Sequence, residues 1–157
     1  MRFTTLTLAM TLAAGAAYAN PVAPGDVSFS DTGAIAESLT GTPGDAASGA
    51  KVLADRGAGN CVACHKISSL DAAFQGTVGP SLDGVGDRWD SAQLRGLVAN
   101  AKHTFPGTIM PSFYKTAGYI RPGDEFSGKA AKGDLQPLLS AEQVEDVVAF
   151  LTTLKQQ

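Results

Sequence analysis

Two cysteines and a histidine stand together in the pentapeptide Cys-Val-Ala-Cys-His at residues 61–65. Thiols three residues apart share one face of a helical turn, and His65 follows Cys64 directly. This Cys-x-x-Cys-His spacing is typical of c-type haem attachment, in which both thiols add to the haem vinyl groups and the histidine binds the iron. The spacing therefore predicts Cys61 and Cys64 as covalent anchors of one haem c, with His65 as an axial ligand.

The other axial position of such an iron needs a second ligand, and the sequence offers two candidates. Met110 is the only methionine after residue 19, and it lies between Pro106 and Pro111, which restrict the backbone around it. Methionines are more often core filler, but the His/Met pair of c-type cytochromes favours Met110 here. His103 is the alternative. A neutral thioether raises the reduction potential relative to a second imidazole, and an iron with both positions filled passes single electrons.

Two other readings of the cysteine pair have less support. A periplasmic dithiol oxidoreductase places its Cys-x-x-Cys at the start of a helix that follows a strand, whereas a helix ended by glycines is expected before Cys61. A zinc site would use Cys61, Cys64, His65 and His103. The adjacent residues Cys64 and His65 cannot easily reach one tetrahedral ion together, and the remaining spacing is unlike that of zinc fingers.

The first 19 residues are typical of a secretory signal peptide. Arg2 precedes an apolar stretch that is too short to span a bilayer, and Ala17-Tyr18-Ala19 is a cleavage signal. Removing residues 1–19 from the 157 leaves 138, which suits one exported, periplasmic domain with no later membrane span. The chain holds 12 basic and 15 acidic residues and no basic run, which excludes a nucleic-acid-binding protein. Two cysteines are too few for a disulfide scaffold.

Three helices are predicted, and no strand pattern, so the fold class is all-α. Asp45 is a candidate N-cap for a helix over 46–56, whose small residues around Gly49 would let another helix cross closely. Asp90 and Gln93 form a capping box for a helix through residue 101. Ser140 and Gln143 form another.

The helix after Ser140 is the best-marked element. Its apolar stripe is Val144, Val147, Val148, Leu151 and Leu154. The acidic residues Glu142, Glu145 and Asp146 lie near its N-terminal end, where the helix dipole favours negative charge.

The remaining segments are predicted to be irregular. Residues 20–43 are either an extended arm with a short helix around 35–39 or a frayed terminus. The loop 66–90 contains Gly79-Pro80, which suits a carbonyl held rigidly as acceptor for the ring of a metal-bound histidine. Residues 114–139, rich in glycine, form a long loop before the last helix. Lys66, Lys102 and Lys115 are candidates for steering an acidic electron acceptor, or else solvated surface charges.

With these motifs in place the chain resembles the class I cytochromes c, and more specifically the SoxX family, the monohaem subunits of SoxAX thiosulfate-oxidising complexes. The likeness beyond the haem pentapeptide rests on the stretches Ser-Leu-Thr-Gly at 38–41, Pro-Gly-Asp at 43–45, Gly-Asn-Cys at 59–61, Val-Gly-Pro-Ser-Leu at 78–82, Met-Pro-Ser-Phe-Tyr at 110–114 and the start of the last helix at 139–147.

The resemblance implies a class I cytochrome c fold over residues 44–157, with helices around one covalent haem, and with the first and last helices crossing where Gly49 and Ala50 meet Phe150 and Leu151. It also implies a periplasmic heterodimer with a SoxA-like dihaem or monohaem subunit. Such a complex is an L-cysteine S-thiosulfotransferase, which couples thiosulfate oxidatively to a cysteine of a SoxYZ carrier. This chain would accept the electrons and pass them to a small acceptor cytochrome, and it would contain no substrate-side catalytic residue.

Two hypotheses therefore remain. In the first, the chain is the electron-accepting subunit of an enzyme, and residues 20–43 and 115–139 are partner-binding additions. In the second, it is a free-standing electron-shuttle cytochrome whose additional segments shield the haem.

Overall fold

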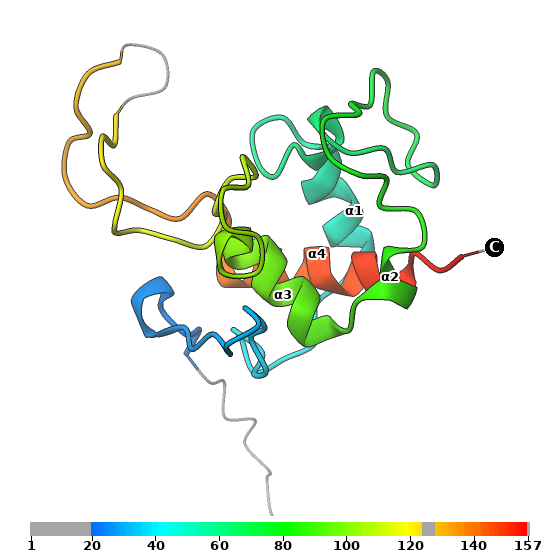
Figure 1. Cartoon of the computed structure of the whole chain (residues 1–157), viewed down its shortest axis with the longest axis horizontal. Coiled ribbons are helices and arrows are strands. Elements are labelled where there is room, and N and C mark those ends of the chain that lie inside the picture. Colours follow the sequence, from blue (N-terminus) through cyan, green and yellow to red (C-terminus); the bar gives the residue numbers. More distant parts are fainter. Residues whose placement is uncertain (1–19, 124–127, 157) are drawn as a thin grey trace, which may run out of the picture.

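Four α-helices carry the fold, which was obtained as a computed structural model and is described for residues 20–123 and 128–156 (Figure 1). The predicted signal peptide lies outside the described residues. The helices are α1 (Ala46–Ala54), α2 (Val85–Arg88), α3 (Ser91–Asn100) and α4 (Ala141–Thr153), with short 3-10 helices η1 (Pro24–Asp26), η2 (Cys61–Ala63) and η3 (Ala101–His103). Within the described part, no strand forms, and Gly123 and Ala130 make one isolated bridge. The all-α prediction is confirmed.

The three predicted helix starts are confirmed, because each depends on a local cap. The Asp45 side chain accepts a hydrogen bond from the Ser48 amide, and the two capping boxes, at Asp90 and at Ser140, are complete. The ends differ slightly from the prediction. Helix α1 ends at Ala54, two residues early, and α3 passes into the 3-10 turn η3 after Asn100.

Helix α4 is central, since it contacts α1, α2 and α3. Its crossing with α1 is backbone against backbone: a Cβ atom on Gly49 would lie 2.0 Å from the carbonyl oxygen of Asp146 and 3.0 Å from the Cβ of Phe150. The predicted crossing at Gly49 and Phe150 is therefore confirmed, and only glycine fits there. The largest fully buried core side chains come from the arm, from α1, α3 and α4 and from the loops between them: Leu39, Leu53, Ile67, Leu94, Leu139, Val144 and Val147.

Helix α2 lies in a segment for which only a loop was predicted. It has four residues and begins after Gly84, whose φ of 70° favours glycine. Its Gly86 amide donates to the Leu154 carbonyl oxygen at the end of α4. Because this helix depends on a contact with a residue far away in the sequence, its own sequence carries no clear signal. None of the helices in the described part is both long and apolar enough to cross a membrane.

The N-terminal segment 20–43 is an ordered arm that packs beneath α3 (Figure 1) and contributes buried Ile35 and Leu39 to the core. Of the two alternatives, the frayed terminus is wrong for the described residues. The short helix predicted around 35–39 is also wrong: those residues are irregular, and the arm's one helical turn is η1. The arm is held by tertiary hydrogen bonds, which satisfy its backbone without a helix.

A buried ion pair provides the strongest of these attachments. Arg95 of α3 and Glu145 of α4 are 7% and 5% exposed, and they form two hydrogen bonds of 2.7 and 3.0 Å. The Arg95 guanidinium also donates to the Ile35 carbonyl oxygen, and the Glu145 carboxylate accepts from the Leu39 amide, each at 2.8 Å. The carboxylate interpreted above as a helix-dipole charge is therefore the centre of a tertiary network.

The loop 114–139 leaves this core and returns to it. Tyr114 and Leu139 at its two ends are buried, and the described parts between them, residues 115–123 and 128–138, extend away from the helices (Figure 1). Tyr119, Ile120 and Leu138 expose 42%, 97% and 57% of their surface. The prediction of a long loop without a core of its own agrees with this arrangement.

Because removing one partner leaves the other charge buried and unpaired, Glu145→Ala is expected to lower the free energy of unfolding by about 3 to 5 kcal/mol. It should also release the arm, which hydrogen exchange at the Leu39 amide would report. The matched control is Lys155→Ala, which breaks the exposed ion pair with Asp87 at 3.3 Å and is expected to cost less than about 1 kcal/mol. Equal losses in the two variants would contradict the role given to the buried pair.

Candidate functional site

The Cys-x-x-Cys-His motif begins one short turn after α1. Gly59 passes close over the end of the helix, where its amide donates to the Val52 carbonyl oxygen, and Asn60 takes a left-handed conformation with φ of 46°. The 3-10 turn η2 follows, and the His65 amide donates to the Cys61 carbonyl oxygen at 2.9 Å. The end of α1 therefore fixes the direction in which all three motif side chains leave the backbone.

Both cysteine side chains are half-buried and free. Burial raises the pKa of the Cys61 thiol to about 12, because the charged thiolate loses its hydration there. Between the two cysteines, Val62 is buried in the core and anchors the turn. The surroundings of Cys61 thus favour an uncharged sulfur, and the sulfur of a haem thioether is uncharged. The two half-buried thiols on one turn, directly before His65, fit covalent haem attachment at the motif.

The His65 ring is held from the loop 66–90. Its Nδ1 lies 2.7 Å from the Pro80 carbonyl oxygen, and because a carbonyl can only accept, Nδ1 carries the proton. The lone pair of the neutral ring is then on Nε2, as metal binding requires. Gly79 permits the approach, since a Cβ atom there would lie 2.3 Å from the ring Cε1. The acceptor expected from Gly79-Pro80 is therefore present.

Met110 is half-buried and packs against the hydrophobic core. Its amide donates to the Thr108 hydroxyl at 3.2 Å, and its carbonyl oxygen accepts from the Lys102 ammonium at 2.7 Å. Two residues further on, the Ser112 hydroxyl donates to the Asn100 side chain at 2.7 Å. The chain around Met110 is thus attached to the end of α3 and to η3.

His103, the other candidate for the sixth position, is placed differently. Its ring is stacked on Phe29 of the N-terminal arm, with the ring centroids 3.9 Å apart and the planes 13° from parallel. Among the described residues, no three His, Cys, Asp or Glu side chains form a group that could hold a metal ion, so the zinc reading with His103 gains no support. The structure orients this histidine toward the arm.

Asn100, Lys102 and Ser112 were not identified as site residues from the sequence. Lys102 was considered only as a steering charge or a solvated lysine, yet its ammonium is bonded to the Met110 carbonyl. Lys115 likewise bonds the Gly118 carbonyl oxygen and lies over the Tyr119 ring. These contacts depend on where the turn η3 and the loop bring distant backbone atoms, and no local pattern encodes that.

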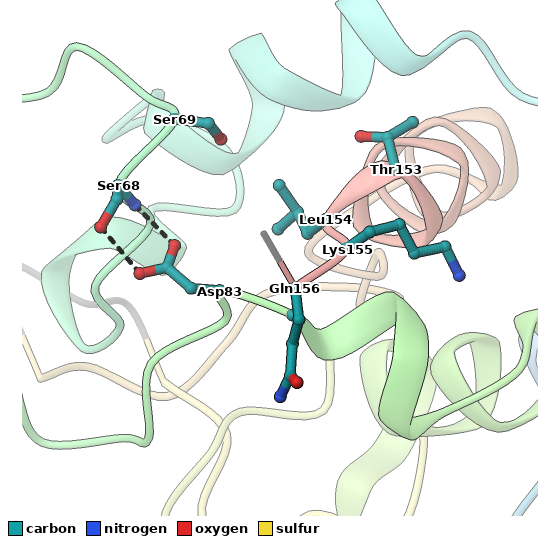
Figure 2. A pocket seen from close by; sticks show the side chains of 8 residues that line it. Ser68, Ser69, Asp83, Thr153, Leu154, Lys155 and Gln156 are labelled. Atoms are coloured by element: carbon teal, nitrogen blue, oxygen red, sulfur yellow. Dashed lines mark hydrogen bonds between the residues drawn. The ribbon is translucent and has the colours of Figure 1, made fainter.

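An open groove of about 620 Å³ lies between the loop 66–83 and the C-terminal end of α4 (Figure 2). In it, the Ser68 hydroxyl and amide both donate to the Asp83 carboxylate, and these bonds hold the pKa of Asp83 below its usual value. None of the two cysteines, His65 and Met110 lines the groove. Its hydrogen bonds close the loop that carries Pro80, so its contribution to the site is structural.

Comparison with known proteins gives a consistent result. The family model for cytochrome c matches residues 46–155. A chain in the crystal structure of SoxXA from P. pantotrophus is 56% identical with a TM-score of 0.83, and the match covers 87% of this chain and 100% of that chain. Cytochrome c-550 from Bacillus subtilis (strain 168) is 34% identical over 53 residues, which are 34% of this chain and 40% of that cytochrome. The match therefore spans less than half of this curated relative.

Gly79→Ala is expected to push the His65 ring off the Pro80 carbonyl. An acceptor at Nδ1 makes the imidazole a stronger donor to iron, which favours Fe(III), so losing it should raise the reduction potential. One hydrogen bond contributes roughly 0.5 to 1.5 kcal/mol, which is at most about a tenfold change in an equilibrium constant. For a one-electron couple a tenfold change in the equilibrium constant is 59 mV, so the rise is expected to be up to about 60 mV.

Potentiometric titration of the haem-loaded protein measures this shift. Gly25→Ala is the control, because nothing lies within 4 Å of a Cβ atom there. An unchanged potential in Gly79→Ala would contradict the role given to this contact.

Proposed function

This chain belongs to the cytochrome c family and carries haem c, and from that premise we propose that it is the electron-transfer subunit of a SoxAX-like complex. The proposal rests on one observation above all: the chain is 56% identical to a chain of a SoxXA structure over that chain's full length. Its resemblance to the SoxX family, given above from the sequence, is confirmed by this match.

In the proposed site Cys61 and Cys64 would form the two thioethers, and His65 and Met110 would hold the iron. The bound haem supplies a couple that accepts and releases one electron. The Pro80 carbonyl holds the proton on Nδ1 of His65. With both His65 and Met110 as ligands, the protein would keep small molecules off the iron. Such a site transfers electrons and does not activate a substrate.

Met110 is proposed over His103 because of what each side chain already contacts. One face of the His103 ring is stacked on Phe29 of the N-terminal arm. Met110 lies half-buried in a segment whose backbone is bonded at its amide and its carbonyl, which leaves the thioether to be directed by a fixed backbone. A metal ligand must be held in position by the residues around it, and the two backbone hydrogen bonds of Met110 do this.

Met110→Leu is expected to abolish the weak red absorption band of sulfur–Fe(III) ligation and to lower the reduction potential, because the soft thioether that favours Fe(II) is lost. His103→Asn, the matched control, should leave both unchanged. Absorption spectra and redox titration of the two purified holoproteins decide the matter. If the band survives in Met110→Leu and disappears in His103→Asn, the ligand assignment is wrong.

The sulfur chemistry is proposed to take place outside this chain. Cys61 and Cys64 are its only cysteines, and thioether formation leaves neither thiol free. A SoxA-like partner would therefore carry the cysteine at which thiosulfate is coupled to a SoxYZ carrier, as in an L-cysteine S-thiosulfotransferase. This chain would receive the electrons released and pass them to a small acceptor cytochrome in the periplasm.

The loop 115–139 is the proposed contact for the partner subunit. Its residues Tyr119, Ile120 and Leu138 are exposed on a segment that extends away from the helices (Figure 1). The arm 20–43 differs, because its Ile35 and Leu39 are buried against the chain's own core. Exposed apolar groups on the loop favour the subunit over the free-standing shuttle, in which the added segments would only cover the haem.

Purification of the chain from its native host is expected to yield a heterodimer with a second c-type cytochrome. The double variant Ile120→Ser with Leu138→Ser should raise the dissociation constant at least tenfold, since each buried apolar side chain contributes roughly 1.5 to 3 kcal/mol. Phe74→Ser is the control, because Phe74 is 95% exposed on another loop. Size-exclusion chromatography with mass spectrometry identifies the partner. A monomer at physiological concentration would support the shuttle instead.

A further inference from the structure

The segment 110–114 is attached to the end of α3 and to η3 at three points. The Lys102 ammonium donates to the Met110 carbonyl oxygen at 2.7 Å, and the Ser112 hydroxyl donates to the Asn100 side chain at 2.7 Å. The Tyr114 amide donates to the Ala99 carbonyl oxygen at 3.0 Å. These bonds fasten the segment along its length, and the first of them acts on the proposed ligand residue itself.

Met110 has little other backbone support. Its amide bonds the hydroxyl of Thr108 within the same loop, and Pro111 has no amide hydrogen to donate. The preceding Ile109 is 82% exposed and makes little contact with the core. Among the described residues, the Lys102 ammonium is therefore the group from another element that holds the backbone of Met110.

The turn that carries Lys102 is held both by the end of α3 and by the arm. The Asn100 side chain accepts from the Lys102 amide at 3.4 Å and caps η3. The two residues after Lys102 contact the arm: the His103 ring is stacked on Phe29, and the Thr104 hydroxyl donates to the Thr32 carbonyl oxygen at 3.1 Å. Lys102 therefore lies in a turn that is held on both sides. Through its ammonium, the Met110 carbonyl is kept in a fixed position relative to α3.

We propose that Lys102 is a positioning residue for the sixth ligand: its ammonium holds the Met110 carbonyl so that the thioether stays on the iron. The inference rests on the proposed assignment of Met110. A thioether is a neutral and weak ligand, and a backbone that drifts by a fraction of an ångström opens its place to competitors. A charge-assisted hydrogen bond is stronger than a neutral one, which suits this task.

The test is imidazole binding to the ferric holoprotein at one fixed pH. Exogenous imidazole must displace the methionine, so its dissociation constant reports how firmly Met110 is held. Lys102→Ala is expected to lower that constant about tenfold, equivalent to 1.4 kcal/mol, and to weaken the red band. Lys102→Arg, which keeps a charged donor, should restore most of the wild-type value.

Two further variants separate this role from general effects. Lys66→Ala removes the same charge beside His65, the other proposed axial residue. Lys66 is exposed, and in the described part of the chain its ammonium makes no hydrogen bond with the segment 110–114, so this variant should behave as wild type. Lys102→Leu keeps the bulk of the aliphatic stem and should behave like Lys102→Ala. A comparable shift in Lys66→Ala would overturn the proposal in favour of a net-charge effect.

Wild-type imidazole affinity in both Lys102→Ala and Lys102→Leu, with the red band lost in Met110→Leu, would also overturn it while leaving the ligand assignment intact. If instead Met110→Leu keeps the band and binds imidazole as the wild type does, the assignment of Met110 itself has failed. The two failures are thus distinguished by the same titrations.

Discussion

The buried ion pair between Arg95 and Glu145 is the constraint on which the rest of the structure depends. Burying two charges is costly unless both are fully hydrogen-bonded, and here the two side chains make four such bonds, two with each other and two with the arm. The pair joins α3, α4 and the N-terminal arm, which are far apart in sequence. Its geometry admits one register of these three elements, and the core packs around that register.

From this frame the chain reaches the two sides of the site by separate routes. Helix α4 crosses α1 at Gly49, and α1 leads within a few residues into Cys61 and the haem motif. Helix α3 leads into η3, whose Lys102 bonds the Met110 carbonyl. The distance between the two proposed axial ligands is therefore set by helix packing, while each ligand is oriented by its own loop. The packed helices fix the positions of the two sides of the site, and the irregular segments carry the proposed ligand side chains.

Local features were predictable from the sequence, and long-range pairings were not. The caps at Asp45, Asp90 and Ser140 need only a few neighbouring residues, and so does the haem motif. The pairing of Arg95 with Glu145 spans 50 residues, and from the sequence Glu145 was indistinguishable from the other acidic residues of the same helix turn. Helix α2 and the bond from Lys102 to Met110 could not be predicted from the sequence for the same reason. Each depends on atoms that only the finished fold brings together.

The two segments added to the helices were also alike from the sequence, and the fold separates them. Both are irregular and rich in small and polar residues, with scattered apolar ones. In the arm, Ile35 and Leu39 enter the core, because the ion pair provides partners for the backbone groups at those positions. In the loop, Ile120 and Leu138 stay exposed. The exposed apolar side chains are the reason why the loop, and not the arm, is the proposed contact for a second protein.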